Sequence, residues 1–408
     1  MVQPKEYKIE DILAHLLTKK WTLMYYMSGE NERWMESDLA EVAGHLDEAD
    51  IFPEIGVVVM FDRRSTGMAE LYYLDWDPLT RRNKRVMKKG FPAPRNMGES
   101  DTLRELIEYA KENCPAERYA LMILGHGSSF MGVAHDNLKD ALSMREIASA
   151  IRDAGIHLDL IVFDACSMAS LEVGLLIKDY VDYMAASEDT VSGGVPAAHL
   201  FHKELISEII NNPDVNPADL SKKVVEVYDR THKGLSNDYT FSAINLLKLS
   251  DVLDKLDHIP EIFSFDPLLE NYDKLVEIFI KARKNVCEYF RGRMIDIYDF
   301  VSTFEKLLME SNIDSLTKDF GKEILTPVKQ AIEDPSDPNR GAVMMSRSGP
   351  YRRRSHGLDI YFPKKPDQII KYYEKATNPI RQMAPKWTEL VIKCASNEKR
   401  FLFLISLP

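Results

Sequence analysis

Cysteine and long apolar runs are both scarce in this chain. Its 408 residues include four cysteines, spaced too widely for a disulfide scaffold, and no CxxC pair suggests a zinc site. No run approaches the roughly 18 apolar residues of a transmembrane helix, and residues 1–20 lack the uninterrupted apolar core of a signal peptide. We therefore expect a cytoplasmic protein without a membrane partner.

Basic residues are also fewer than acidic residues. The chain has 52 Lys and Arg residues against 64 Asp and Glu residues, which gives a formal net charge of −12. This balance argues against a nucleic-acid-binding surface. The hydrophobic content of 45% and the charged content of 28% are typical of a globular protein, and the length allows a large core.

The signatures of several enzyme classes are missing. HExxH, P-loop and GxGxxG motifs are absent, and Gly125-His126-Gly127-Ser128-Ser129 does not form the GxSxG elbow of an α/β-hydrolase. A cysteine phosphatase needs an arginine six positions after its thiol, but that position after Cys166 is Glu172. Two pairs of side chains are alternative metal ligands, which we interpret instead as exposed loop residues: His135 with Asp136, and His157 with Asp159. The residues themselves therefore predict no metal or cofactor.

Two apolar runs each end in residues capable of nucleophilic catalysis. Leu158 to Phe163 is followed by Asp164-Ala165-Cys166, and Tyr119 to Leu124 by Gly125-His126-Gly127. Each run is typical of a buried strand, and the amphipathic helix between them is long enough for a right-handed crossover. The strands are then parallel and adjacent, with carboxyl ends about 5 Å apart at the edge where α/β sheets bind ligands. The pattern predicts a thiol and an imidazole at one site.

Cys166 and His126 have the chemistry of a nucleophile and its base. A thiolate requires a base or a cationic neighbour, and a histidine within hydrogen-bonding reach supplies both. The amides of Gly127 and Cys166 can donate to the oxyanion of a tetrahedral intermediate, because neither residue is proline. The alternative is that Cys166 and His126 are ordinary structural residues, as most isolated cysteines are.

The first half of the chain alternates strands with helices. Further predicted elements are strands at 22–27, 55–61 and 183–186, a hairpin that includes 70–75, and helices at 35–46 and 170–178. Capping boxes at Thr102-Leu103-Arg104-Glu105 and Ser143-Met144-Arg145-Glu146 begin two more helices, and Gly155 suits the end of the second. This alternation predicts an α/β fold with a mostly parallel sheet and helices on both faces.

The second half is mainly helical. Helical patterns from about 200 to 335 are interrupted by a strand at 240–244, and strand patterns return at 342–345 and 358–362. The sequence contains no low-complexity linker or internal repeat. We therefore expect an α/β catalytic core over 1–200, a helical elaboration over 201–335, and strands and a tail over 336–408 that pack on the core.

Six segments that follow one another along most of the chain resemble one enzyme family. They are residues 21–27 with Glu30-Asn31, Asn96-Met97-Gly98, Leu124-Gly125-His126-Gly127, 163–168, Ala186-Ser187-Glu188 and 357–363. The resemblance is to the clostripain family of cysteine peptidases, which shares the caspase–haemoglobinase fold with caspases, legumain and gingipains. It implies a caspase-like fold and a His126–Cys166 dyad with Cys166 as the nucleophile. It also implies an oxyanion site at the Gly127 and Cys166 amides and cleavage of proteins or peptides after basic residues.

An alternative function is a catalytically silent, peptide-binding or regulatory protein of the same fold. A degenerate site usually loses one of its two catalytic residues, whereas this chain keeps both His126 and Cys166. A non-peptidase acyl-transfer enzyme is a more distant alternative. The family resemblance also allows a calcium requirement, and we expect a monomer.

The preference for basic residues requires a buried carboxylate in the substrate pocket. In relatives of this kind the acid two positions before the nucleophile lies near that pocket, and Asp164 holds this position; its alternative role is to cap a loop amide. The loop after the next strand is a second wall, with Ser187, Glu188 and Asp189 as candidates. Some relatives carry an acid near the Gly-Gly turn that this chain lacks, so we do not expect a strict preference for arginine.

Some relatives mature by cleavage between the His and Cys strands. Lys139 and Arg145 are the candidate processing sites in this chain. Arg145 lies in a capped helical turn that a protease would first have to unfold, whereas Lys139 lies in a polar loop. We therefore predict that self-processing, where it occurs, follows Lys139.

Overall fold

The computed structural model describes residues 18–29, 33–49, 51, 54–63, 68–77, 80, 82–89, 95–135, 140–191, 196–265, 271–337, 339–369 and 378–396. The chain folds into two compact units. The first unit comprises residues 1–127, 131–165 and 192–235, and the second comprises residues 128–130, 166–191 and 236–408. The domain boundaries expected at residues 200 and 335 stay a prediction.

The sheet of the first unit is mostly parallel. Its strands are β1 (Lys19–Ser28), β2 (Ile55–Arg63), β3 (Met68–Asp77), β4 (Arg82–Met87), β5 (Ala116–Leu124) and β6 (Leu158–Asp164). They lie in the order β6-β5-β1-β2-β3-β4. The pairs β1–β2, β1–β5 and β5–β6 are parallel, as the alternation of strands and helices predicts. β3 and β4 form the predicted hairpin and add an antiparallel edge to the sheet.

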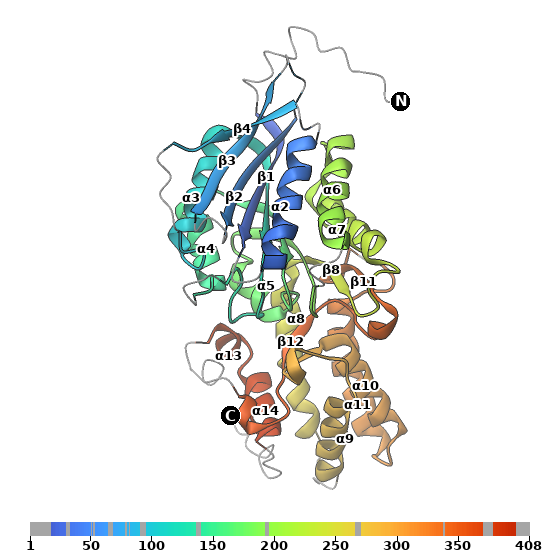
Figure 1. Cartoon of the computed structure of the whole chain (residues 1–408). Coiled ribbons are helices and arrows are strands. Elements are labelled where there is room, and N and C mark those ends of the chain that lie inside the picture. The colour runs from blue at the N-terminus through green and yellow to red at the C-terminus, as the bar shows by residue number, and fades with distance from the viewer. Residues whose placement is uncertain are drawn as a thin grey trace. The chain divides into compact units, whose positions relative to one another are not determined.

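Helices cover both faces of this sheet, which confirms the predicted fold class. The helices are α2 (Arg33–Glu48), α3 (Ser100–Asn113), α4 (Met144–Asp153), α6 (Pro196–Asn211) and α7 (Pro217–His232). α2, α6 and α7 lie on one face, and α3 and α4 lie on the other (Figure 1). The central strand β1 is buried over residues 21–28, since it has strands on both sides and helices above and below.

One of the two predicted capping boxes is present. α4 begins with Ser143 and Glu146, whose side chains bond each other's backbone amides at 3.3 and 2.9 Å. The box predicted at Thr102 is wrong, because α3 already begins at Ser100 and Thr102 is a buried residue inside the helix. The Glu105 carboxylate instead forms ion pairs with Lys88 and Arg95, so it is not available to cap the helix.

The second unit contains three strands paired antiparallel, one separate small sheet and most of the helical C-terminal region. Its strands are β7 (Val181–Ala186), β8 (Thr240–Asn245), β9 (Glu288–Tyr289), β10 (Met294–Asp296), β11 (Val343–Ser348) and β12 (Asp359–Tyr361). β8 pairs antiparallel with both β7 and β11. β12, β10 and β9 form a separate antiparallel sheet, so the strands predicted near 343 and 360 belong to different sheets.

The helices of the second unit enclose an aromatic core. The α-helices are α5 (Leu171–Ile177), α8 (Leu249–Leu256), α9 (Tyr272–Lys284), α10 (Ile297–Glu310), α11 (Ser315–Ile332), α13 (Pro379–Met383) and α14 (Pro385–Ala395). Short 3-10 turns occur at Leu246–Lys248, Ile259–Phe263, Phe290–Gly292, Pro350–Arg352 and Pro366–Gln368. Phe279, Phe300 and Trp387 are fully buried, and the Phe279 and Phe300 rings pack edge to face at 5.2 Å. Within the described residues, no helix has the length and apolar character needed to cross a membrane.

Candidate active site

The carboxyl end of β5 carries His126 into a tight turn. The strand pair β5–β6 ends with Leu124 opposite Asp164, and the Gly125 amide donates to the Asp164 carbonyl at 3.3 Å. Gly125 has φ +146°, a conformation that favours glycine, and the His126 carbonyl accepts from the Ala134 amide at 2.9 Å. The predicted parallel, adjacent strands are therefore confirmed. In the chain, His126 and Cys166 each follow the last registered pair, Leu124–Asp164, by two residues.

The loop that begins at Cys166 is held by the segment after β7. The Ser167 amide donates to the Asp189 carbonyl, and the Ala169 amide donates to the Ser187 carbonyl, both at 2.9 Å. Ser167 has φ +59°, a left-handed conformation that a serine adopts only when its surroundings enforce it. These bonds fix the backbone on the carboxyl side of Cys166.

Val191 provides a backbone contact to Cys166, the candidate nucleophile, that sequence reasoning missed. Its amide nitrogen lies 3.4 Å from Cys166 Sγ and donates to it. The Val191 carbonyl oxygen lies 4.0 Å from the same sulfur, so the backbone of one residue contacts Cys166 both as a donor and as an acceptor. The interaction uses only the backbone, so the residue type at position 191 carries no signal of it.

Two of the other cysteines are unsuited to nucleophilic chemistry. All four cysteines are free of disulfides. Burial raises the pKa of Cys114 to about 11 and the pKa of Cys394 to about 12. Both therefore stay protonated near neutral pH, and a protonated thiol is a poor nucleophile.

Asp164 has an internal partner, the imidazole of His202. Its Oδ2 lies 2.9 Å from His202 Nε2, and the Asp164 side chain retains 12% exposure while His202 is 1% exposed. The His202 ring packs edge-on against Tyr25 and Phe201, with centroids 5.6 and 4.7 Å apart. Sequence reasoning missed His202, because α6 follows the α/β alternation and nothing in its apolar pattern shows which strand end it faces.

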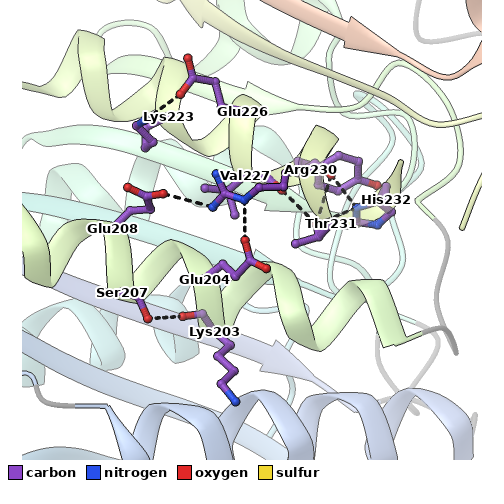
Figure 2. A network of polar contacts seen from close by, with 11 residues as sticks. Lys203, Glu204, Ser207, Glu208, Lys223, Glu226, Val227, Arg230, Thr231 and His232 are labelled. Atoms are coloured by element: carbon purple, nitrogen blue, oxygen red, sulfur yellow. Dashed lines mark hydrogen bonds and ion pairs between the residues drawn. The ribbon is translucent and has the colours of Figure 1, made fainter. Parts of the chain in front are cut away.

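α6 is held in place by α7. Figure 2 shows Arg230 of α7 reaching two acids of α6, with its guanidinium 2.7 Å from Glu204 and 3.1 Å from Glu208. On the buried side, Phe201 packs edge-on against Tyr228 at 5.3 Å. These contacts fix the helix turn that presents His202 to Asp164.

A second histidine lies near this cluster. His232 stacks on Tyr228 at 3.8 Å, and its Nδ1–H donates to the Tyr228 carbonyl at 2.9 Å. Burial lowers the pKa of His232. The neutral imidazole is therefore favoured, and His232 adds no strong positive charge beside Asp164.

The three candidate residues after β7 are all buried and all have internal partners. Ser187 Oγ lies 2.9 Å from Thr240 Oγ1, and the Glu188 carboxylate accepts from the Gly357 amide at 3.0 Å. Burial raises the pKa of Glu188 well above its usual range, and the neighbouring Asp296 adds to this effect. Asp189 forms an ion pair with Arg352. The substrate-binding role expected for these three side chains stays a prediction.

Residues 357–361 brace the loop of the nucleophile from a distant part of the chain. Gly357 has φ +94°, and a Cβ there would lie 2.5 Å from Ser242 Cβ, so only glycine fits. The Asp359 amide donates to the Ala169 carbonyl at 3.0 Å, and the Tyr361 amide donates to Glu172 Oε1 at 2.9 Å. Segments that are far apart in the family resemblance therefore meet at one loop.

The remaining candidates are the expected processing sites and the alternative metal ligands. Lys139 and Asp136 lie outside the described residues, and Arg145 is an exposed residue in the first turn of α4. The Asp159 carboxylate accepts from the Tyr119 amide at 2.8 Å. Across the part of the chain that the structure describes, no group of three His, Cys, Asp or Glu side chains is placed to hold a metal ion.

Comparison with known proteins identifies the family. The family model for the clostripain family, peptidase family C11, matches residues 25–390. The chain belongs to the clostripain family. It is therefore a clostripain-like cysteine peptidase, and the expected caspase-like fold and enzyme class are confirmed.

Individual relatives are distant in sequence. Clostripain from Hathewaya histolytica is 23% identical over 423 residues, which cover 88% of this chain and 78% of clostripain. A secreted C11 cysteine protease from Bacteroides thetaiotaomicron, "iotapain", has a TM-score of 0.60 at 16% identity, with 85% of this chain and 94% of the protease covered. An inactive zymogen C11 protease from Parabacteroides distasonis also has a TM-score of 0.60 at 16% identity, with 93% and 99% covered. These likenesses in structure show the shared fold.

Proposed function

We propose that this cysteine peptidase cleaves proteins or peptides through a dyad of Cys166 and His126. The observation that carries the proposal is the register of β5 and β6. Leu124 lies opposite Asp164, and each candidate residue follows this pair by two positions. The side chains that follow neighbouring parallel strands share one edge of the sheet, where α/β proteins place their sites.

In each half of the reaction, acylation and deacylation, His126 takes up one proton and later releases one. His126 takes the proton from the Cys166 thiol, and the thiolate attacks the carbonyl carbon of the scissile bond. The amides of Gly127 and Cys166 donate to the oxyanion that forms. The C–N bond then breaks, His126 passes its proton to the leaving amine, and an acyl-enzyme remains. Water, deprotonated by His126, hydrolyses the thioester and restores both residues.

P1 is the substrate residue before the scissile bond. We assign Asp164 as the acid that binds a basic side chain at P1. Of the three candidate pocket acids, Glu188 is buried with a raised pKa, and Asp189 already has its charge balanced by the permanently protonated Arg352. Asp164 instead faces the imidazole of His202, which does not carry the permanent charge of a guanidinium. Asp164 therefore provides the net negative charge that a lysine or arginine side chain needs.

A peptide series tests the proposal against the silent-protein alternative. Fluorogenic peptides that differ only at P1, with arginine, lysine or glutamine, are incubated with wild type and with Cys166→Ala. A C11 protease from Bacteroides thetaiotaomicron has been solved with an irreversible peptide inhibitor, so peptide ligands suit related proteins. We expect turnover by wild type, fastest with basic P1 residues, and none by Cys166→Ala. Binding without turnover in the wild type would favour the regulatory alternative.

A further inference from the structure

Asp189 belongs to the segment that contacts the Cys166 loop, and its carboxylate is paired with an arginine of the chain itself. Asp189 is 6% exposed and forms an ion pair with the guanidinium of Arg352. The backbone of the same segment contacts the nucleophile loop, because the Asp189 carbonyl accepts from Ser167 and the Val191 amide donates to Cys166 Sγ. The ion pair is therefore built on the strip of chain that touches the catalytic sulfur.

Arg352 is held in position by the backbone around it. It ends the 3-10 turn Pro350–Arg352, whose entry is fixed where the Gly349 amide donates to the Tyr239 carbonyl at 2.8 Å. The Tyr351 amide donates to the Asn237 carbonyl at 2.9 Å. The guanidinium also lies over the Tyr289 ring, 5.5 Å from its centroid. An anchored arginine loses little entropy when it pairs with a carboxylate.

The pair changes the charge that a substrate meets. Arginine stays protonated at all working pH values, so Arg352 cancels the charge of Asp189 in the segment that contacts Cys166. The Arg352 side chain is 29% exposed, so its positive charge is not fully screened from a basic residue bound nearby. The pair therefore weakens the attraction for a basic P1 residue.

We propose that Arg352 sets the strength of the preference for basic P1 residues by neutralising Asp189 beside Cys166. The proposal rests on the peptidase site proposed above. It makes Arg352 a specificity-determining residue that acts through Asp189, without contact to the scissile bond.

Three charge variants test this role in the full-length chain. The readout is the ratio of kcat/KM for an arginine peptide to kcat/KM for a glutamine peptide of otherwise identical sequence. Burial raises the pKa of Asp189, so the assay is run at pH 8 to keep this carboxylate ionised. Arg352→Gln then leaves Asp189 unbalanced, so the ratio should rise about three- to tenfold. Asp189→Asn leaves Arg352 unbalanced, so the ratio should fall by a similar factor. The double variant removes both charges and should return to within about twofold of the wild-type ratio.

Two further variants separate charge from structure. Arg353 is the exposed neighbour of Arg352, and Arg353→Gln removes the same charge one position away, so it should leave the ratio unchanged. Arg352→Lys keeps the charge and should keep the ratio even if its stability falls. Circular dichroism confirms that each variant is folded.

Several results would overturn the inference. A double variant with a ratio as low as that of Asp189→Asn would show that Asp189 contacts the substrate directly. An equal loss of kcat/KM on both peptides would assign the ion pair a purely structural role. An unchanged ratio in active Arg352→Gln would remove the role in specificity. A wild type without any turnover would instead contradict the proposed peptidase site, so the two failures can be told apart.

Discussion

Replacing Asp164 by asparagine isolates the charge of the proposed pocket from its structure. Asparagine keeps an oxygen that can accept from His202 Nε2, where the present distance is 2.9 Å, so the hydrogen bond survives and only the charge is lost. We therefore expect the free energy of unfolding to change by less than about 1 kcal/mol. Loss of a desolvated charge partner costs roughly 2–5 kcal/mol of binding to an arginine or lysine side chain. kcat/KM on basic substrates should fall at least tenfold (about 1.4 kcal/mol), and less on glutamine peptides.

The assay compares peptides that differ only at P1, and urea unfolding measures the stability of the same samples. Asp159→Asn is the matched control, because Asp159 lies on the same strand and its carboxylate accepts the backbone amide of Tyr119, so the substitution removes a charge on β6 away from its carboxyl end. It should leave the ratio between basic and neutral substrates unchanged. An equal loss on all substrates in Asp164→Asn would refute the pocket role and assign Asp164 to support of the Cys166 loop. Glu188 and Asp189 would then be the next candidates.

Three further predictions concern the nucleophile, processing and stability. Cys166→Ala should abolish turnover and leave the fold intact, whereas replacing Cys114 or Cys394, whose pKa values are raised to about 11 and 12, should leave most activity; activity that persists in Cys166→Ala would refute the assignment. Mass spectrometry of wild type should show any self-cleavage after Lys139 and an intact Cys166→Ala chain; cleavage in both would indicate another protease. Burial lowers the pKa of His356, but its bond to Glu333 (2.8 Å) and the charge of Asp296 outweigh this and raise the pKa above 6.5. The stabilisation of the fold by protonated His356 is therefore complete below about pH 6.5 and is lost as the pH rises through the raised pKa. In urea unfolding between pH 5.5 and 8.5, the free energy of unfolding should decline less in His356→Asn than in wild type.

The strand–crossover–strand unit could be predicted from sequence because its information is local. Each of the two strands is a continuous apolar run, and a capped helix with Gly155 at its end lies between them. The parallel, adjacent pairing of the two strands then follows from the right-handed crossover. The same local reasoning failed at Thr102, because the Glu105 carboxylate is claimed by Lys88 and Arg95 from outside the helix.

The partners of two of the candidate pocket acids, Asp164 and Asp189, could not be predicted. His202 reaches Asp164 from α6, and Arg352 reaches Asp189 from a turn more than a hundred residues further along the chain. Neither contact can be recognised from the periodicity of the sequence. A single side chain that faces a strand end does not change the apolar pattern of its own helix or turn. Such contacts depend on how helices and turns pack, which the chain specifies only as a whole.

The same distinction explains why segments outside the dyad belong to the family resemblance. The Gly357 amide binds Glu188, the Ser187 and Asp189 carbonyls hold the loop after Cys166, and the Asp359 amide holds that loop from the other side. Most of these bonds end on backbone atoms, so the position of the sulfur depends on chain conformation more than on side chains near it. A catalytic thiol that is off by about 1 Å loses much of its rate, because attack requires near-contact geometry. The distant segments therefore fix the loop after Cys166, and the role proposed for Arg352 acts through Asp189, whose backbone belongs to the same set of contacts.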